Sequence, residues 1–126
     1  MKRNVNILTL LKEDQEQKLL TDWLNLKKIR FYAIPNGGSR NLLEAIKLKR
    51  TGVKPGVPDL CLPFPSGDWH GMYIEMKRKE GGRISQQQQD WLDYLFANGY
   101  YVGVAYGFEM AKEMVEYYLS LNKTAA

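Results

Sequence analysis

Residues 57–79 read VPDLCLPFPSGDWHGMYIEMKRK, and this stretch decides the fold that the sequence predicts. Two β-rich runs, at 57–62 and 71–79, flank a segment at 63–68 that is rich in proline, serine, glycine and aspartate. Such clusters favour turns, and the short separation makes an antiparallel hairpin the simplest connection. We therefore expect the two runs to lie side by side as paired strands.

The second run places two charged side chains on one face of its strand. Successive side chains alternate between the faces, so Glu75 and Lys77 share a side and lie about 6.5–7 Å apart along the strand. In the first run, Asp59 sits among apolar residues, where a carboxylate is costly unless something pairs with it. Pairing of the two strands would bring Asp59 beside Glu75.

Two neighbouring carboxylates and a lysine suggest a metal-assisted reaction. Close carboxylates repel each other, and a divalent cation is the usual resolution. Oxygen ligands at a partly open site suit Mg²⁺ or Mn²⁺, which can polarise a phosphoryl oxygen and activate a water molecule. Lys77 is suited to orient or help deprotonate that water and to stabilise charge in the transition state. Together, Asp59, Glu75 and Lys77 predict hydrolysis of a phosphate ester.

The rest of the chain alternates between helical and extended patterns. Apolar spacing and cap signals predict helices near residues 14–28, 39–50, 85–98 and 108–121, and β-rich segments predict further strands at 29–34 and 100–105. Ser39 and Ser85 stand where the caps of two of these helices belong. The order α, β, α, β, β, α, β, α predicts an α/β fold with a mixed β-sheet flanked by helices.

Length and composition limit the class of protein. A chain of 126 residues can bury one hydrophobic core but is too short for two ordinary domains, so we expect a single domain over residues 1–126. Its apolar runs are far shorter than the roughly 20 residues of a membrane helix, and its N-terminus does not resemble a secretion signal. The single cysteine, Cys61, excludes an internal disulfide and a multi-cysteine zinc site. These features favour the cytosol.

The basic residues form two clusters in the sequence. The net charge of +4 is by itself only a mild indication of a polyanionic partner. Candidate contacts to a DNA backbone are Arg40, Lys47, Lys49, Arg50 and Lys54 in the first cluster, with Lys79 and Arg83 in the second. A solvated charged surface explains either cluster equally well when it is taken alone.

The motifs Gly56-Val57-Pro58-Asp59 and Ile74-Glu75-Met76-Lys77 resemble the PD…ExK signature of the PD-(D/E)XK nuclease superfamily. The longer pattern is similar to its VRR-NUC branch, the virus-type replication-repair nuclease domain. The supporting elements are Glu16, residues 34–38, residues 54–59, and residues 85–88 followed by Trp91 and Leu92. The resemblance spans about residues 13–105 and implies a restriction-endonuclease-like core.

The resemblance also implies roles for individual residues. Asp59 and Glu75 would bind Mg²⁺ or Mn²⁺ with the main-chain carbonyl of Met76, and Lys77 would be the catalytic lysine. Glu16 would contribute to the metal site, and Gln88 would orient the groups of the active site. The implied partner is DNA, since small stand-alone members resemble structure-selective endonucleases of the Holliday-junction-resolvase kind that act as homodimers. The C-terminal helix or the loop after Pro63 could form the dimer interface.

Structural alternatives stand beside these functional interpretations. Glu16 could be a carboxylate favoured by the helix macrodipole, and Gln88 could form a capping box with Ser85. Glu75 and Lys77 could be an ordinary exposed pair on a strand. The competing functions are a non-catalytic DNA-binding module and a protein-interaction domain. Metal-dependent cleavage of DNA would distinguish a nuclease from the DNA-binding module. Salt-insensitive binding to a partner, without retention on DNA, would indicate the protein-interaction domain.

Overall fold

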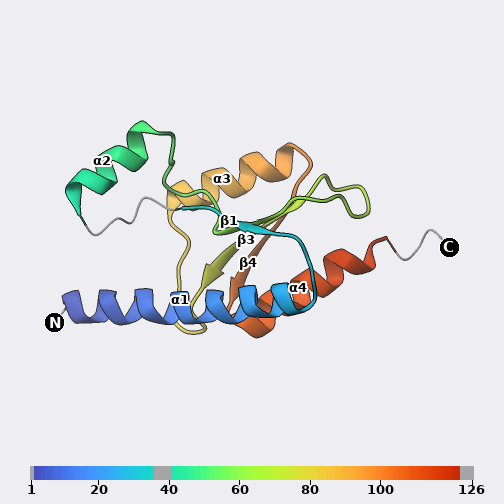
Figure 1. Ribbon diagram of the computed structural model, residues 1–126, viewed down its shortest axis with the longest axis horizontal. Helices are drawn as coiled ribbons and strands as arrows, with labels where there is room; N and C mark the ends of the chain where they lie inside the picture. Colours follow the sequence, from blue (N-terminus) through green and yellow to red (C-terminus); the bar gives the residue numbers. More distant parts are fainter. Residues whose placement is uncertain (1, 36–40, 123–126) are drawn as a thin grey trace.

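Helices and strands follow each other in the order that the sequence predicts (Figure 1). The computed structural model describes the backbone of residues 2–35 and 41–122, and the side chains from residue 12 onward within those ranges. The elements are α1 (Lys2–Leu26), β1 (Tyr32–Ala33), α2 (Leu42–Arg50), β2 (Leu60–Leu62), β3 (Met72–Lys77), α3 (Gln86–Ala97), β4 (Tyr101–Tyr106) and α4 (Phe108–Ser120). None of the described helices is long and apolar enough to cross a membrane. The predicted α/β class is confirmed.

The four strands form one mixed sheet in the order β1-β2-β3-β4. β2 and β3 are the predicted antiparallel hairpin, with Leu60 opposite Ile74, and β1 extends the antiparallel part. β4 runs parallel to β3 along its whole length. Continuing the β2–β3 register by one residue sets Asp59 opposite Glu75. The hairpin therefore brings the two carboxylates together.

Helices cover both faces of the sheet (Figure 1). α1 and α4 pack on one face, and α3 lies on the other. The residues of β3 that enter the core with α1 and α4 are Met72, Ile74 and Met76. The core residues from these two helices are Leu20, Leu24, Ala111, Val115 and Tyr118. Because side chains alternate along a strand, Glu75 and Lys77 point toward the face that carries α3.

Several boundaries differ from the prediction. α1 begins at Lys2 rather than near residue 14, because no proline or glycine interrupts residues 2–26. β2 begins at Leu60 rather than at residue 57, since Pro58 has no N–H to donate to a neighbouring strand. α2 begins at Leu42 and is capped by the side chain of Asn41. The predicted cap Ser39 and the loop at 36–38 lie outside the described residues.

α2 stands apart from the rest of the described fold (Figure 1). None of its nine residues is buried, and within the described part of the chain it packs against no other helix or strand. Leu42 and Leu43 are 75% and 79% exposed. A helix this short is marginal in water without tertiary packing. α2 therefore leaves an apolar surface that no other described element covers.

Candidate active site

Asp59 is fixed by hydrogen bonds in two directions. Its carboxylate Oδ2 accepts a hydrogen bond from the main-chain N–H of Met76 at 2.7 Å. Its main-chain carbonyl accepts one from the N–H of Ile34 at 2.8 Å. The first bond ties the side chain to β3, and the second ties the main chain to the residue that follows β1. The Asp59 carboxylate is thereby held at the middle of the sheet.

Glu75 and Lys77 are buried together on β3. They are 3% and 6% exposed, and Lys77 Nζ lies 3.7 Å from Glu75 Oε2. Burying two charges is costly, and their attraction compensates for it only where further hydrogen bonds satisfy the remaining polar atoms. Gln88 on α3 supplies one such bond, donating from Nε2 to Glu75 Oε2 at 3.2 Å. The structure thus brings four of the predicted site residues together: Asp59, Glu75, Lys77 and Gln88.

The two carboxylates of the site, when both are ionised, carry negative charge that the protein only partly balances. Burial and the neighbouring Asp59 raise the pKa of Glu75 to about 8, although the charge of Lys77 opposes this rise. Burial also raises the pKa of Asp59, against the N–H of Met76, which lowers it. Raised pKa values of both carboxylates mean that the positive charge near them is too small to stabilise their ionised forms. A divalent cation would supply that charge.

The donor set fits a cation that keeps part of its hydration shell. Within the described ranges, no group of three or more His, Cys, Asp or Glu side chains is arranged to hold a metal ion. Mg²⁺ does not need such a cage, because it usually retains several waters and is bound by one or two carboxylates together with substrate phosphates. Asp59 and Glu75 provide two carboxylates on neighbouring strands. Their chemistry therefore fits Mg²⁺ or the similar Mn²⁺.

Gln88 serves as both a helix cap and a site residue. Its Oε1 accepts a hydrogen bond from the N–H of Ser85 at 2.9 Å, and Ser85 Oγ accepts one from the N–H of Gln88 at 3.1 Å. These two bonds form the capping box at the start of α3. The amide nitrogen of the same side chain donates to Glu75. The two interpretations of Gln88 are therefore compatible, because an amide has one acceptor and one donor end.

Glu16 interacts with the start of α4. Its Oε1 accepts a hydrogen bond from the N–H of Phe108 at 2.7 Å. The N-cap residue of α4 is Gly107, which has no side chain to do this. Glu16 therefore caps α4 and complements its macrodipole, rather than that of its own helix. The structure places this carboxylate at the start of α4, and its contribution to the metal site stays a prediction.

Glu13 on α1 interacts electrostatically with the candidate site residues. Burial raises the pKa of Glu13, while the charge of Lys77 lowers it and that of Asp59 raises it further. Glu13 is therefore within electrostatic reach of both residues. It precedes the buried Leu20 by seven residues, a spacing that keeps both on one side of a helix. This spacing was the available signal for Glu13, which was not among the predicted site residues.

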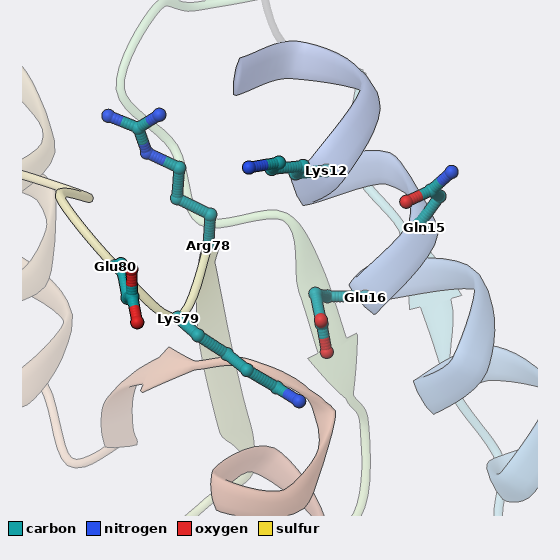
Figure 2. A pocket seen from close by; sticks show the side chains of 6 residues that line it. All are labelled: Lys12, Gln15, Glu16, Arg78, Lys79 and Glu80. Carbon is teal, nitrogen blue, oxygen red and sulfur yellow. The ribbon is translucent and has the colours of Figure 1, made fainter. Parts of the chain in front are cut away.

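The predicted DNA contacts lie at the surface. The exposed cations are Lys47, Lys49 and Arg50 on α2, Lys54 in the loop that follows it, and Lys79 and Arg83 after β3. Arg40 lies outside the described residues. Lys79 of the second cluster lines a hollow between α1 and the chain that follows β3 (Figure 2), to which Lys12 and Arg78 also contribute. These two residues were not among the predicted contacts.

Comparisons with known proteins agree with this fold and site. The family model for the VRR-NUC domain matches residues 11–109. A solved structure described as a VRR-NUC domain protein shares 28% sequence identity with this chain. The match covers 88% of this chain and 90% of the solved chain, and the two structures superpose with a TM-score of 0.76. No curated protein matches. The fold and the site define a nuclease-type domain that acts on DNA. The chain belongs to the VRR-NUC family.

Proposed function

We propose that the protein is an endonuclease that uses Mg²⁺ or Mn²⁺ to hydrolyse phosphodiester bonds in DNA. The observation that carries this proposal is the placement of Lys77 Nζ 3.7 Å from Glu75 Oε2, on the strand beside Asp59. An ammonium group next to two partly desolvated carboxylates suits the attack of water on phosphorus, because the ammonium group can stabilise the negative charge that develops on the phosphate while the carboxylates hold a cation.

Each residue has its own role in this proposal. Asp59 and Glu75 would hold the cation with the main-chain carbonyl of Met76, and the bound cation supplies Lewis-acid polarisation of a phosphoryl oxygen and of water. Lys77 orients the attacking water and stabilises the negative charge that develops on the phosphate. Gln88 keeps the Glu75 carboxylate in place through its 3.2 Å hydrogen bond. Glu13 adds a third carboxylate at the edge of the site.

The first test is cleavage of labelled four-way junction, flap and linear duplex DNA with Mg²⁺ or Mn²⁺. We expect paired cuts in the junction and none in the presence of EDTA, because the carboxylates need the cation to act on a phosphate. Equal cutting of every substrate would retain the nuclease but contradict the proposed structure selectivity. Absence of cutting with both metals would favour the non-catalytic DNA-binding module on the same fold.

We also propose that the protein acts as a homodimer, because two symmetric cuts in a junction need two sites related by a two-fold axis. The C-terminal helix and the loop after Pro63 were the two surfaces predicted for the interface. α4, however, buries Val115 and Tyr118 within its own chain, and the ring of Phe64 packs 5.8 Å from that of Tyr118. Much of the apolar surface of both segments is thus used inside one subunit.

α2 offers a better dimer contact. Its exposed Leu42 and Leu43 have no covering element in the described part of the chain. A hollow of about 300 Å³ on α3, lined by Asp90, Trp91 and Tyr94, provides an apolar surface of suitable size. The last turn of α2 is basic, whereas α3 carries Asp90 and Asp93, so the charges of the two helices are complementary. Mutual docking of α2 on the partner's α3 closes a two-fold dimer.

Replacing Leu43 with aspartate is expected to weaken the dimer by at least about tenfold, because it puts a charge into an apolar contact. Sedimentation at several protein concentrations measures the change, and Tyr94→Ala on the receiving surface should act in the same direction. Lys18→Ala, an exposed substitution on α1, is the matched control. An unchanged dimer in both interface variants would contradict this interface, and a monomeric wild type would contradict the homodimer.

A further inference from the structure

A hollow of about 340 Å³ opens between α1 and the chain that follows β3 (Figure 2). The residues that line it are Lys12, Gln15, Glu16, Arg78, Lys79 and Glu80. Three of these are cations and two are carboxylates. Along the chain, Lys12 precedes Glu13 and Arg78 follows Lys77.

Electrostatic interactions also place Arg78 close to the catalytic groups. Burial raises the pKa of Glu13, whereas the charges of Lys77 and Arg78 both lower it. Arg78 is therefore within reach of the same carboxylate that interacts with Lys77. A ligand in the hollow would be a near neighbour of a phosphate held at the catalytic residues.

Close contacts with two glycines position the cations. The stem of Lys79 lies across Gly107, where an added Cβ would come within 2.7 Å of Lys79 Cγ. Arg78 donates a hydrogen bond from Nη2 to the carbonyl of Gly81 at 3.2 Å. Gly81 has a φ of 75°, which favours glycine, and a Cβ there would lie 2.8 Å from Arg78 Nη2. The two side chains are thus held against the backbone of neighbouring segments.

The two lysines of the hollow are not paired with its carboxylates. Glu16 is engaged by the first turn of α4, and the carboxylate of Glu80 points away from Lys12 in Figure 2. Among the described residues, Lys12 and Lys79 have no carboxylate at ion-pair distance. Lys12 also extends toward Arg78 (Figure 2). Cations that converge in this way repel each other, and an anion between them removes the repulsion.

We propose that this hollow binds a phosphate group of the DNA strand that is cut, within about two nucleotides of the scissile phosphate. This inference rests on the proposed nuclease function and deepens it. A DNA strand presents phosphates at a regular rise of about 3.4 Å, so a strand held at the catalytic residues brings further phosphates close by. The guanidinium of Arg78 suits bidentate contact with phosphate, and Lys12 and Lys79 add point charges. The contact fixes the register of the strand relative to Lys77.

Methylphosphonate scanning tests this inference. In the Lys77→Ala background with EDTA, where no cleavage occurs, we would measure the affinity for junctions that carry one uncharged methylphosphonate, moved one position at a time along the strand. We expect one position near the cut to weaken binding by about tenfold, the effect of losing a charge-assisted contact. Adding Lys12→Ala and Arg78→Ala should abolish this position-specific effect and reduce the slope of log K against log salt by about 1.

Lys18→Ala in the same background is the matched control. Lys18 lies on the same helix but pairs with Asp22 at 2.8 Å, outside the hollow, so the scan should keep its sensitive position. Circular dichroism and the unfolding midpoint verify that each variant is folded. An unchanged sensitive position in the Lys12 and Arg78 variant would refute the subsite, as would a sensitive position far from the mapped cut. Failure of the wild type to cut the unmodified junction would instead refute the nuclease function.

Discussion

Lys77→Ala is expected to lower the single-turnover cleavage rate by about 10²- to 10⁴-fold while DNA affinity in EDTA changes little. Lys77 is 6% exposed and its Nζ lies 3.7 Å from Glu75 Oε2, so its charge acts at the candidate catalytic carboxylates and adds little to the outer binding surface. Burial raises the pKa of Glu75, and the variant also loses the charge that opposes this rise. Rapid-quench measurements with the protein in excess over labelled junction DNA give the rate.

Two further variants make the Lys77 result specific. Lys77→Arg keeps the positive charge but replaces a compact ammonium with a planar guanidinium, so we expect it to remain strongly impaired. Lys18→Ala removes an exposed lysine of α1 and should cut at the wild-type rate. A Lys77→Ala protein that cuts nearly as fast as the wild type would contradict the catalytic role of this lysine.

Glu75→Gln is expected to abolish cleavage and, in EDTA at pH 8, to raise the free energy of unfolding by about 0.5–2 kcal/mol. The glutamine retains the shape of the side chain and removes a charge that is poorly solvated in its buried position. Burial, reinforced by Asp59, raises the pKa of Glu75 from its ordinary 4.5 to about 8. The site therefore holds its carboxylates at a cost in stability when no cation is bound.

The pH dependence of the metal-free protein follows from the same pKa. Between about pH 4.5 and 8 the native protein retains a proton on Glu75 that the unfolded chain releases. The contribution of Glu75 to stability therefore falls as pH rises through this range. The affinity for a cation increases with pH over the same range, because the ion binds the deprotonated carboxylate. Urea unfolding in EDTA from pH 5 to 8 should show a decline in the wild type that is smaller in Glu75→Gln. A variant less stable than the wild type at pH 8 would contradict this account.

Much of the site follows from a period of two along the strands. Alternation along β3 is sufficient to place Glu75 and Lys77 on one face, and the hairpin then brings Asp59 to them. The contribution of Gln88 was also predictable, because it follows Ser85 at capping-box spacing and faces the sheet. The same side chain therefore forms the capping box and donates a hydrogen bond to Glu75.

The sequence alone could not show which acidic residue of α1, Glu13 or Glu16, interacts with the candidate site. Glu13 and Glu16 precede Leu20 by seven and four residues, so both fall on the same side of the helix. Their roles differ because of a feature far away in the sequence. α4 starts at a glycine that has no side chain to cap it, so Glu16 accepts the hydrogen bond from the main-chain N–H of the next residue. In the same way, the sequence predicts α2 as an amphipathic helix. No local pattern indicates that the other described helices and strands leave its apolar face uncovered.

The contacts around Gly107 also affect the order in which the protein can become active during synthesis. The N–H of Gly107 donates to the carbonyl of Lys77 at 2.9 Å, and the next residue is the one that Glu16 caps. α1 leaves the ribosome well before β4 and α4 do, and segments that pair across such distances can assemble only after the later one has emerged. A nascent chain that already contains Asp59, Glu75 and Lys77 therefore still lacks the strand and helix that hold them in place. We therefore expect the candidate site to be complete only after β4 and α4 have been synthesised and have packed against β3.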